Sequence, residues 1–164
     1  MAPTLRVVNT ADAALASALV QLSFLELAGG DWEPEAHQSF LNESSPIALS
    51  EALNTSIYAA GAFVADAMVG FLLMPKPSHL SMLFVHPDYL RQGIARQLWE
   101  RARGHVEANF PEIKTIELNA TPYAVDFYRS VGFVPISTEF TISGCRATRM
   151  ACWLPARALG ATVS

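Results

Sequence analysis

The stretch Pro87-Asp88-Tyr89-Leu90-Arg91-Gln92-Gly93-Ile94-Ala95 decides the fold of this chain. An apolar segment with the composition of a β-strand precedes it, and an amphipathic segment with helical spacing follows it. A loop that leads from a strand into a helix presents backbone N–H groups that have no partner within the helix, at the positive end of the helix dipole. Gly93 lets a ligand come close to the backbone. The stretch therefore predicts a cradle for a phosphate or diphosphate, with an ordinary strand-to-helix turn as the alternative.

Outward from this cradle, the chain predicts strands and helices in the order βααβββαβαββ. Strands are expected at residues 5–8, 57–64, 68–74, 79–86, 115–118, 133–142 and 147–154. Helices are expected from a cap at Thr10 to the pair Gly29-Gly30, from Asp31 to about Leu41, from the cradle to Pro111, and from Thr121 to Val131 with Gly132 just beyond the end. The Ser-rich segment 42–54 is expected to be a loop or a broken helix. This order predicts an α/β (α+β) architecture, in which helices flank a mixed sheet.

Apolar spacing assigns an inward face to two of these helices. In the first helix the inward residues are Leu15, Leu19 and Leu22, and Glu26 falls on the same face one turn later. In the helix after the cradle the expected inward residues are Ala95, Leu98, Ala102 and Val106, and the outward ones are Arg96, Glu100, Arg103 and Glu107.

Length and composition favour one globular domain over residues 1–155, with residues 156–164 as a tail. The chain has 164 residues, of which 51% are hydrophobic and 16% are charged. Its net charge of −4 argues against a surface that coats nucleic acid, because such surfaces are usually basic. We therefore expect no nucleic-acid partner.

The N-terminal sequence lacks the charged and apolar regions of a signal peptide, and no stretch is expected to approach the length of a membrane span. The expected location is therefore the cytoplasm, without a membrane partner. Cys145 and Cys152 are the two cysteines, and neither has a partner at metal-ligand spacing. We expect no metal site and no structural disulfide, and we interpret Cys152 as a small core hydrophobe.

Two blocks of this sequence resemble the GNAT superfamily of N-acetyltransferases. The first, residues 83–95, is similar to the superfamily's acyl-CoA signature, although Leu90 replaces a frequent Arg or Gln and Ala95 replaces a frequent glycine. The second, residues 119–133, is similar to the later motif in which a short helix carries Phe and Tyr ahead of a Gly-Phe pair. The resemblance implies a GNAT-like, mostly antiparallel sheet of about six or seven strands with a splayed parallel pair. Neither a P-loop nor a dinucleotide fingerprint occurs, which argues against ATP and NAD.

The resemblance also implies the residues that hold acetyl-CoA. Backbone amides of the cradle would bind the diphosphate of coenzyme A, and these belong to Arg91, Gln92, Gly93, Ile94, Ala95 and Arg96. The backbone of Leu83, Phe84 and Val85 would pair with the pantetheine arm as an added strand does. Asn119 would contact pantetheine through its side chain, or alternatively cap the next helix. Ala124, Phe127 and Tyr128 would line the cofactor wall.

Tyr128 is the principal catalytic candidate, because a phenol near the leaving sulfur can stabilise or protonate a thiolate. The alternative is a tyrosine that only packs between helix and sheet. The attacking amine must also lose a proton, and the strand at 79–86 holds no Asp or Glu. His79 is therefore the first candidate for the base, with Glu26 and Glu33 next. His37, His86 and His105 are interpreted as surface residues.

The resulting hypothesis is an acetyl-CoA-dependent N-acetyltransferase that acts on a primary amine of a small molecule or peptide. An acyl-CoA-binding module without turnover and a purely structural interaction domain are the alternatives. Helices near residues 12–41 and the Ser-rich segment are expected to form the acceptor pocket, in which Trp32 is either an aromatic wall or a core anchor. The apolar final strand is compatible with a homodimer.

Overall fold

The computed structural model of the chain describes residues 2–155. The tail predicted at 156–164 lies outside the described residues.

The N-terminal half builds a four-stranded antiparallel sheet in the order β1-β2-β3-β4. Its strands are β1 (Thr4–Val7), β2 (Tyr58–Val64), β3 (Ala67–Met74) and β4 (Met82–Val85). The hairpin predicted between β2 and β3 is confirmed, and Ala65 takes a positive φ of 53° in its turn. Of the strand expected over 79–86, the residues Met82–Val85 form β4, and single hydrogen bonds from the N–H groups of Ser81 and His86 to β3 extend it at either end.

A second sheet has the order β5-β8-β6, and β7 also pairs with β8. Its strands are β5 (Thr115–Ala120), β6 (Val134–Pro135), β7 (Phe140–Ile142) and β8 (Cys145–Trp153). The single strand expected at 133–142 is therefore wrong, because the chain leaves the sheet between β6 and β7.

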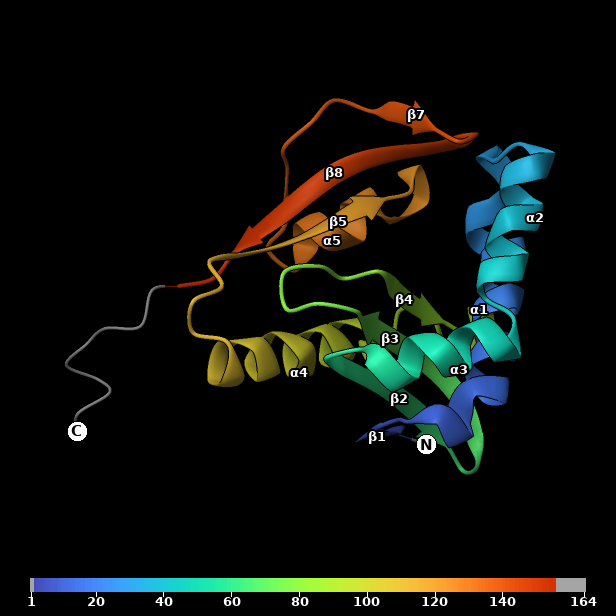
Figure 1. The fold of residues 1–164 in the computed structure, drawn as a ribbon, viewed down its shortest axis with the longest axis horizontal. Helices are drawn as coiled ribbons and strands as arrows, with labels where there is room; N and C mark the ends of the chain where they lie inside the picture. The colour runs from blue at the N-terminus through green and yellow to red at the C-terminus, as the bar shows by residue number, and fades with distance from the viewer. Residues whose placement is uncertain (1, 156–164) are drawn as a thin grey trace.

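The two sheets join at one parallel bridge between His79 and Glu117. There the Leu80 N–H donates to the Glu117 carbonyl at 3.1 Å, and the Glu117 N–H donates to the Ser78 carbonyl at 2.9 Å. Beyond this bridge β4 and β5 separate toward the side where α1 and α2 lie (Figure 1). The mixed, mostly antiparallel fold with a splayed parallel pair is confirmed.

Helices cover both faces of this framework. A 3₁₀ turn, η1 (Thr10–Asp12), leads into α1 (Ala13–Ser23), which continues as the π-helical turn η2 (Phe24–Ala28) and the 3₁₀ turn η3 (Gly29–Asp31). The other helical elements are α2 (Pro34–Glu43), α3 (Pro46–Thr55), η4 (Pro87–Tyr89), α4 (Ile94–Asn109), η5 (Pro122–Ala124) and α5 (Val125–Ser130). One apolar core packs α4 and α5 on the sheets, and another packs α1 and α3 on the opposite face of β2 and β3.

Two expectations about the first helix are wrong, and the structure decides between two alternatives for the segment that follows α2. Asn9 rather than Thr10 is the cap, because its side chain accepts from the Ala11 N–H at 2.9 Å while its own N–H donates to Asp12 at 3.0 Å. Leu15 and Leu22 are exposed, and Leu19 is buried together with small residues such as Ala16. The segment 42–54 is the broken helix rather than the loop: α2 ends at Glu43, and α3 begins at Pro46 because Ser45 caps it and Pro46 occupies its first turn.

The helical run Thr10–Ala28 is long and apolar enough, by length and composition alone, to cross a membrane, with 19 residues and a mean hydropathy of 1.4. This corrects the expectation that no stretch approaches that length. Ala16, Leu19 and Val20 of this run are buried against the sheet and α3. The core helix of a water-soluble protein has the same properties, so the run is weak evidence for a membrane.

Candidate active site

The predicted cradle forms the junction between η4 and α4. Arg91 and Gly93 both take left-handed backbone conformations, with φ of 61° and 79°. Among the described residues, the first N–H of this run that bonds a carbonyl is that of Gln97, which donates to Gly93 at 3.0 Å. The amides from Arg91 to Arg96 are therefore left for a ligand or solvent. Arg91, Gln92 and Gly93 are exposed, whereas Ile94 is buried and anchors the helix start.

The open edge of β4 is the second feature of the site. The His86 N–H donates to the Val69 carbonyl at 2.9 Å, which continues the register that pairs Val85 with Gly70. Because hydrogen-bonded and non-bonded pairs alternate in an antiparallel ladder, the backbone groups of Phe84 are used by β3. Those of Leu83 and Val85 point the other way, toward the gap before β5. Of the three residues expected to pair with pantetheine, Leu83 and Val85 thus direct their backbone groups to this edge.

Ser23 adds a contact at this edge that the sequence did not indicate. Its hydroxyl donates to the Val85 carbonyl at 3.1 Å, and its side chain is buried at the junction of α1 and η2. A serine inside an apolar helix gives no periodic or motif signal, so only the three-dimensional packing reveals it.

Tyr128 lies on α5, on the α4 side of the separating strands. The helix ends in the expected glycine motif, in which the Phe133 N–H donates to the Tyr128 carbonyl at 2.9 Å and Gly132 has a φ of 107°. The Tyr128 ring is buried against Phe127 and Phe133, at centroid distances of 5.3 and 5.4 Å. Burial raises the pKa of the Tyr128 hydroxyl above its ordinary value, so that the phenol stays protonated at neutral pH.

The neighbouring residues of α5 and α4 are also close to each other. Ala124 and Phe127 are half-buried against the core that contains Tyr128. The Arg96 guanidinium donates to the Ser130 carbonyl at 3.3 Å, which ties the start of α4 to the end of α5. The structure therefore brings the cradle and the predicted cofactor wall together.

His79 sits at the bridge between the two sheets and is half-buried. Burial lowers its pKa from the ordinary 6.5, and the positive charges of Lys76 and Arg149 lower it further. The imidazole is therefore neutral at pH 7. Asn119, which is exposed near the end of β5, accepts from Arg149 Nε at 3.4 Å.

Glu26 lies exposed on the π-helical turn. Within residues 2–155 no hydrogen bond or ion pair joins it to Tyr128 or His79, although its turn η2 contacts η5, which leads into the helix of Tyr128. Glu33 is the cap residue of α2, and its N–H donates to the carbonyl of Gly144 at 3.2 Å. This bond places the tip of the β7–β8 hairpin against the start of α2.

An aromatic cluster fills the space between η2, α2 and β4. Phe24 contacts Trp32 and Phe40 at centroid distances of 4.7 and 4.2 Å, and Phe40 lies 5.9 Å from Phe84 of β4. The Trp32 indole nitrogen is the one buried side-chain nitrogen or oxygen in the described part of the chain without a hydrogen-bond partner. Trp32 thus belongs to this cluster beside the open edge of β4.

The histidines expected at the surface are all half-buried. His37 packs on Phe24, and its Nε2 hydrogen bonds to the Gly29 carbonyl. His86 Nδ1 accepts from the Asp88 N–H at 3.0 Å and so caps η4, while His105 stacks on Tyr58 at 4.8 Å. Each ring therefore has a packing or capping role beside its partly exposed position.

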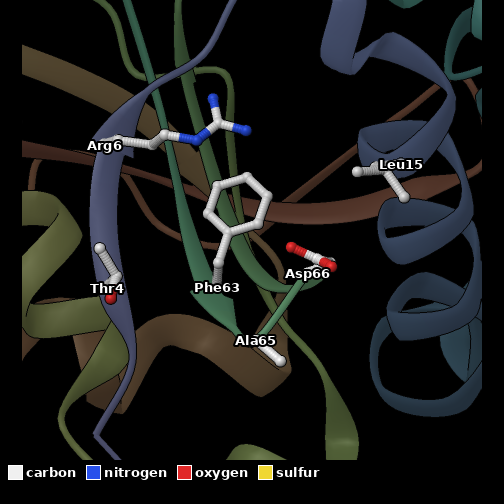
Figure 2. Close-up of a pocket in the computed structure, with 6 residues that line it drawn as sticks. All are labelled: Thr4, Arg6, Leu15, Phe63, Ala65 and Asp66. Atoms are coloured by element: carbon white, nitrogen blue, oxygen red, sulfur yellow. The ribbon is translucent and has the colours of Figure 1, made fainter.

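A separate depression of about 420 Å³ lies where β1 and α1 approach the β2–β3 turn. Figure 2 shows Arg6 above the Phe63 ring, with Leu15 on the neighbouring helix. The Arg6 guanidinium lies 4.2 Å from the ring centroid and also forms two hydrogen bonds with Asp12, at 3.0 and 3.1 Å. The Arg6 guanidinium is already paired with Asp12, and no residue of the cradle lines the depression. The depression therefore takes no part in the site formed by the cradle and β4.

Both cysteines are free, and Cys152 is buried as expected. Within the described residues no group of three or more His, Cys, Asp or Glu side chains is arranged to hold a metal ion.

Comparison with known proteins identifies a matching family model and a related sequence. Residues 29–154 match the family model of the acetyltransferase (GNAT) domain. The chain is 31% identical over 103 residues to the peptidyl-lysine N-acetyltransferase YjaB of Escherichia coli, a match that covers 60% of this chain and 67% of that protein.

Solved structures share the whole fold. A GCN5-related N-acetyltransferase from Rhodopseudomonas palustris has a TM-score of 0.80 at 23% identity, over 94% of this chain and 97% of that one. The PaiA N-acetyltransferase from Thermoplasma acidophilum, in complex with coenzyme A, has a TM-score of 0.78 at 20% identity, over 94% and 100% of the two chains.

Proposed function

The chain belongs to the GNAT acetyltransferase family, and from that premise we propose that it moves the acetyl group of acetyl-CoA to a primary amine of a small molecule or peptide. The observation that carries the proposal is the run of amides from Arg91 to Arg96, none of which bonds a carbonyl of residues 2–155. These donors lie at the start of α4, where the helix dipole favours an anion. Family members use acetyl-CoA, whose diphosphate suits such a run.

The residues present fit the donor. The cradle would hold the diphosphate of acetyl-CoA, and the edge-facing backbone groups of Leu83 and Val85 would pair with the amides of its pantetheine arm. Bound in this way, acetyl-CoA supplies the acetyl group as a thioester. PaiA, which shares this fold, was solved with coenzyme A, and that supports the same donor here.

The acceptor amine must be neutral to attack. A lysine-like ammonium has a pKa of about 10.4, which makes the free amine cost roughly 4.6 kcal/mol at pH 7. His79, neutral because burial lowers its pKa, would accept this proton directly or through water. Glu26 and Glu33 remain second candidates for this role.

Tyr128 would act on the departing sulfur. In direct attack within a ternary complex, the amine nitrogen forms the new C–N bond, the C–S bond breaks, and the thiolate leaves. Full proton transfer from a phenol to a thiolate is uphill by about 2 kcal/mol from ordinary pKa values. Burial raises the pKa of Tyr128 and increases this cost. We therefore assign the hydroxyl the role of hydrogen-bond donor to the developing thiolate.

For the acceptor, we propose a peptide lysine as the first substrate class to test. The relative YjaB is a peptidyl-lysine N-acetyltransferase, which supports this choice. The aromatic cluster beside β4 would contact the aliphatic part of a lysine side chain, and the exposed carboxylates of Glu26 and Glu33 would favour its cation.

An acceptor screen tests the proposal. Purified protein is incubated with acetyl-CoA and, separately, lysine peptides, polyamines, amino sugars and amino acids, and the free thiol of coenzyme A is measured. Thiol release above the rate without acceptor, together with a mass increase of one acetyl group on the acceptor, is the expected result.

The alternative function, an acyl-CoA-binding module without turnover, predicts a different outcome. Titration calorimetry would then show binding of acetyl-CoA while every amine in the screen fails to release thiol. An absence of binding at millimolar acetyl-CoA would overturn both functions.

A further inference from the structure

Ser23 connects the first helix to the edge strand of the donor site. It is the last residue of α1, its side chain is 1% exposed, and its hydroxyl donates to the Val85 carbonyl at 3.1 Å. Within residues 2–155 this is the one side-chain hydrogen bond between α1 and β4. The second apolar core also joins these elements, and the side chains of Met82 and Phe84 supply the β4 side.

The bond uses a carbonyl that otherwise belongs to the open edge. The alternation of the ladder points the N–H and C=O of Leu83 and of Val85 toward the gap before β5. Ser23 takes the last of these groups, the Val85 carbonyl. The groups left for an added strand are both backbone groups of Leu83 and the N–H of Val85.

The position of Val85 also determines how the chain enters the cradle. Only His86 separates Val85 from η4, and η4 leads to Arg91, the first cradle residue with a positive φ. α1 itself changes to a π-helical turn directly after Ser23, and this turn contacts η5, the entry to the helix of Tyr128. Interruptions of this kind within α-helices occur frequently at functional sites.

We propose that Ser23 is a positioning residue for the acyl donor: by holding the Val85 carbonyl, it ends the pairing edge of β4 and aligns the cradle that follows. This inference rests on the proposed function, because it concerns the same donor site. Its test therefore measures donor binding directly and needs no acceptor.

The experiment compares Ser23→Ala with a matched variant of the same helix. Ser17 is also buried on α1, and its hydroxyl also donates to a backbone carbonyl, that of Ser44 at 2.6 Å. Ser17→Ala therefore reproduces the loss of a buried hydrogen bond away from the donor site. Both variants are titrated with coenzyme A by calorimetry, and their unfolding midpoints are measured in urea.

The Ser23→Ala variant is expected to raise the Kd for coenzyme A by roughly 2- to 12-fold, the effect of one hydrogen bond. Ser17→Ala is expected to lower the unfolding midpoint similarly and to leave this Kd unchanged. Ser23→Thr, which keeps a hydroxyl, is expected to restore most of the affinity. If Ser23→Ala does not fold, Ser23→Cys gives the same comparison with a weaker donor of similar size.

Equal Kd values for wild type and the Ala or Cys variant at position 23 would overturn the inference and leave the proposed function standing. A matching rise in Ser17→Ala would also overturn it, because the effect would then be one of general stability. If wild-type protein does not bind coenzyme A, the proposed function itself fails.

Discussion

Tyr128 has a buried ring that packs in the core and a hydroxyl with a proposed catalytic role. Removing the hydroxyl oxygen alone should therefore lower the rate without disturbing the packing. Tyr128→Phe keeps the packing on Phe127 and Phe133 but deletes the donor to the leaving thiolate. We expect kcat to fall by about 100-fold, at the lower end of the effect of losing one donor to developing negative charge, and the Kd for acetyl-CoA to change less than about twofold. Steady-state thiol release and calorimetry measure the two quantities.

Tyr123 offers the matched control, because it lies on η5 and its side chain is 55% exposed. Tyr123→Phe should leave both quantities near wild-type values. An unchanged kcat in Tyr128→Phe would show that Tyr128 has a packing role alone.

His79 predicts a pH dependence with a defined sign. Its pKa is lowered below 6.5, so the ring is a free base at pH 7 and gains a proton only as the pH falls below that value. We expect kcat/KM to decrease on the acidic side through this lowered pKa. His79→Gln should reduce kcat/KM by roughly 100-fold at pH 7 and remove this acidic limb, as measured by pH–rate profiles from about pH 4.5 to 8.

His105 on α4 provides the comparison, since it stacks on Tyr58 and has no part in the proposed proton transfer. His105→Gln should keep the acidic limb. If the acidic limb of the pH–rate profile persists in His79→Gln, His79 is not the base, and Glu26 and Glu33 become the candidates.

Individual residues differ in how much the sequence reveals of them. The places of Gly93 and Gly132 were predictable from local sequence. Gly93 lies in a loop that leads into a helix and Gly132 at a helix end, and the neighbouring residues indicate both features. The roles of Ser23 and His37 were not predictable, because their partners, the Val85 and Gly29 carbonyls, are brought to them by tertiary packing.

At the level of elements, α4 predicts opposite effects for two glycines. Gly93→Ala places a Cβ at a φ of 79°, which costs roughly 1–2 kcal/mol for an L-residue. Gly104 lies inside α4, where an added Cβ would meet no neighbouring side chain or other element within 4 Å. Gly104→Ala should therefore stabilise the protein by about 0.5–1 kcal/mol. Urea unfolding measures both changes.

The same pair separates stability from binding. Gly93→Ala is also expected to weaken coenzyme A binding, because it alters the loop that orients the cradle amides, whereas Gly104→Ala should bind normally. Equal affinity in the two variants would indicate that the amides after Arg91 are not the anion site.

Helix faces show where hydropathy misleads. Leucines 15 and 22 were expected inside because they are among the most apolar residues of α1, yet Ala13, Ala16 and Ser17 occupy the buried face with Leu19 and Val20. Small side chains let α1 lie close to β3 and α3, and this requirement is not visible in periodicity. The sequence left α3 open between a loop and a broken helix, because Ser45-Pro46 is typical of a loop and also of a helix start.

For the whole molecule, the pair Arg6–Asp12 predicts how stability depends on pH. Hydrogen bonds from Arg6 lower the pKa of the Asp12 carboxyl below its ordinary 3.8. A carboxylate with a lowered folded-state pKa stabilises the native state above its unfolded pKa, and this contribution disappears as the pH falls through the folded value. Asp12→Asn should therefore lower the thermal midpoint at pH 7, and the difference from wild type should shrink below about pH 4.

Thermal scans at about pH 3, 5 and 7 measure this difference. Asp66→Asn, at an exposed position in the β2–β3 turn, is the control and should differ little from wild type at any of these pH values. A deficit in Asp12→Asn that stays constant with pH would show that the charge of Asp12 is not the source of the effect.

The fold class followed from the sequence because the hairpin, the cradle and the last helix each carry local signals, whereas the order of elements did not separate α3 from α2 or β7 from β6. The division into two sheets with one bridge at His79 and Glu117 did not follow from the sequence, because it depends on where distant strands stop pairing. The two blocks that resemble the GNAT superfamily, residues 83–95 and 119–133, lie on either side of the gap between β4 and β5.

The central place of β8 bears on the order in which the site is assembled during synthesis. Among the strands that the structure describes, β5 and β6 are joined through β8 alone, and the hairpin tip next to β8 contacts Glu33 at the start of α2. A nascent chain that has emerged as far as Tyr128 thus holds the cradle and the phenol but has no antiparallel partner to align β5. Residues 145–153 supply this partner, so a chain stalled on the ribosome before them would hold β5 only through its parallel bridge at His79 and through its packing in the first apolar core.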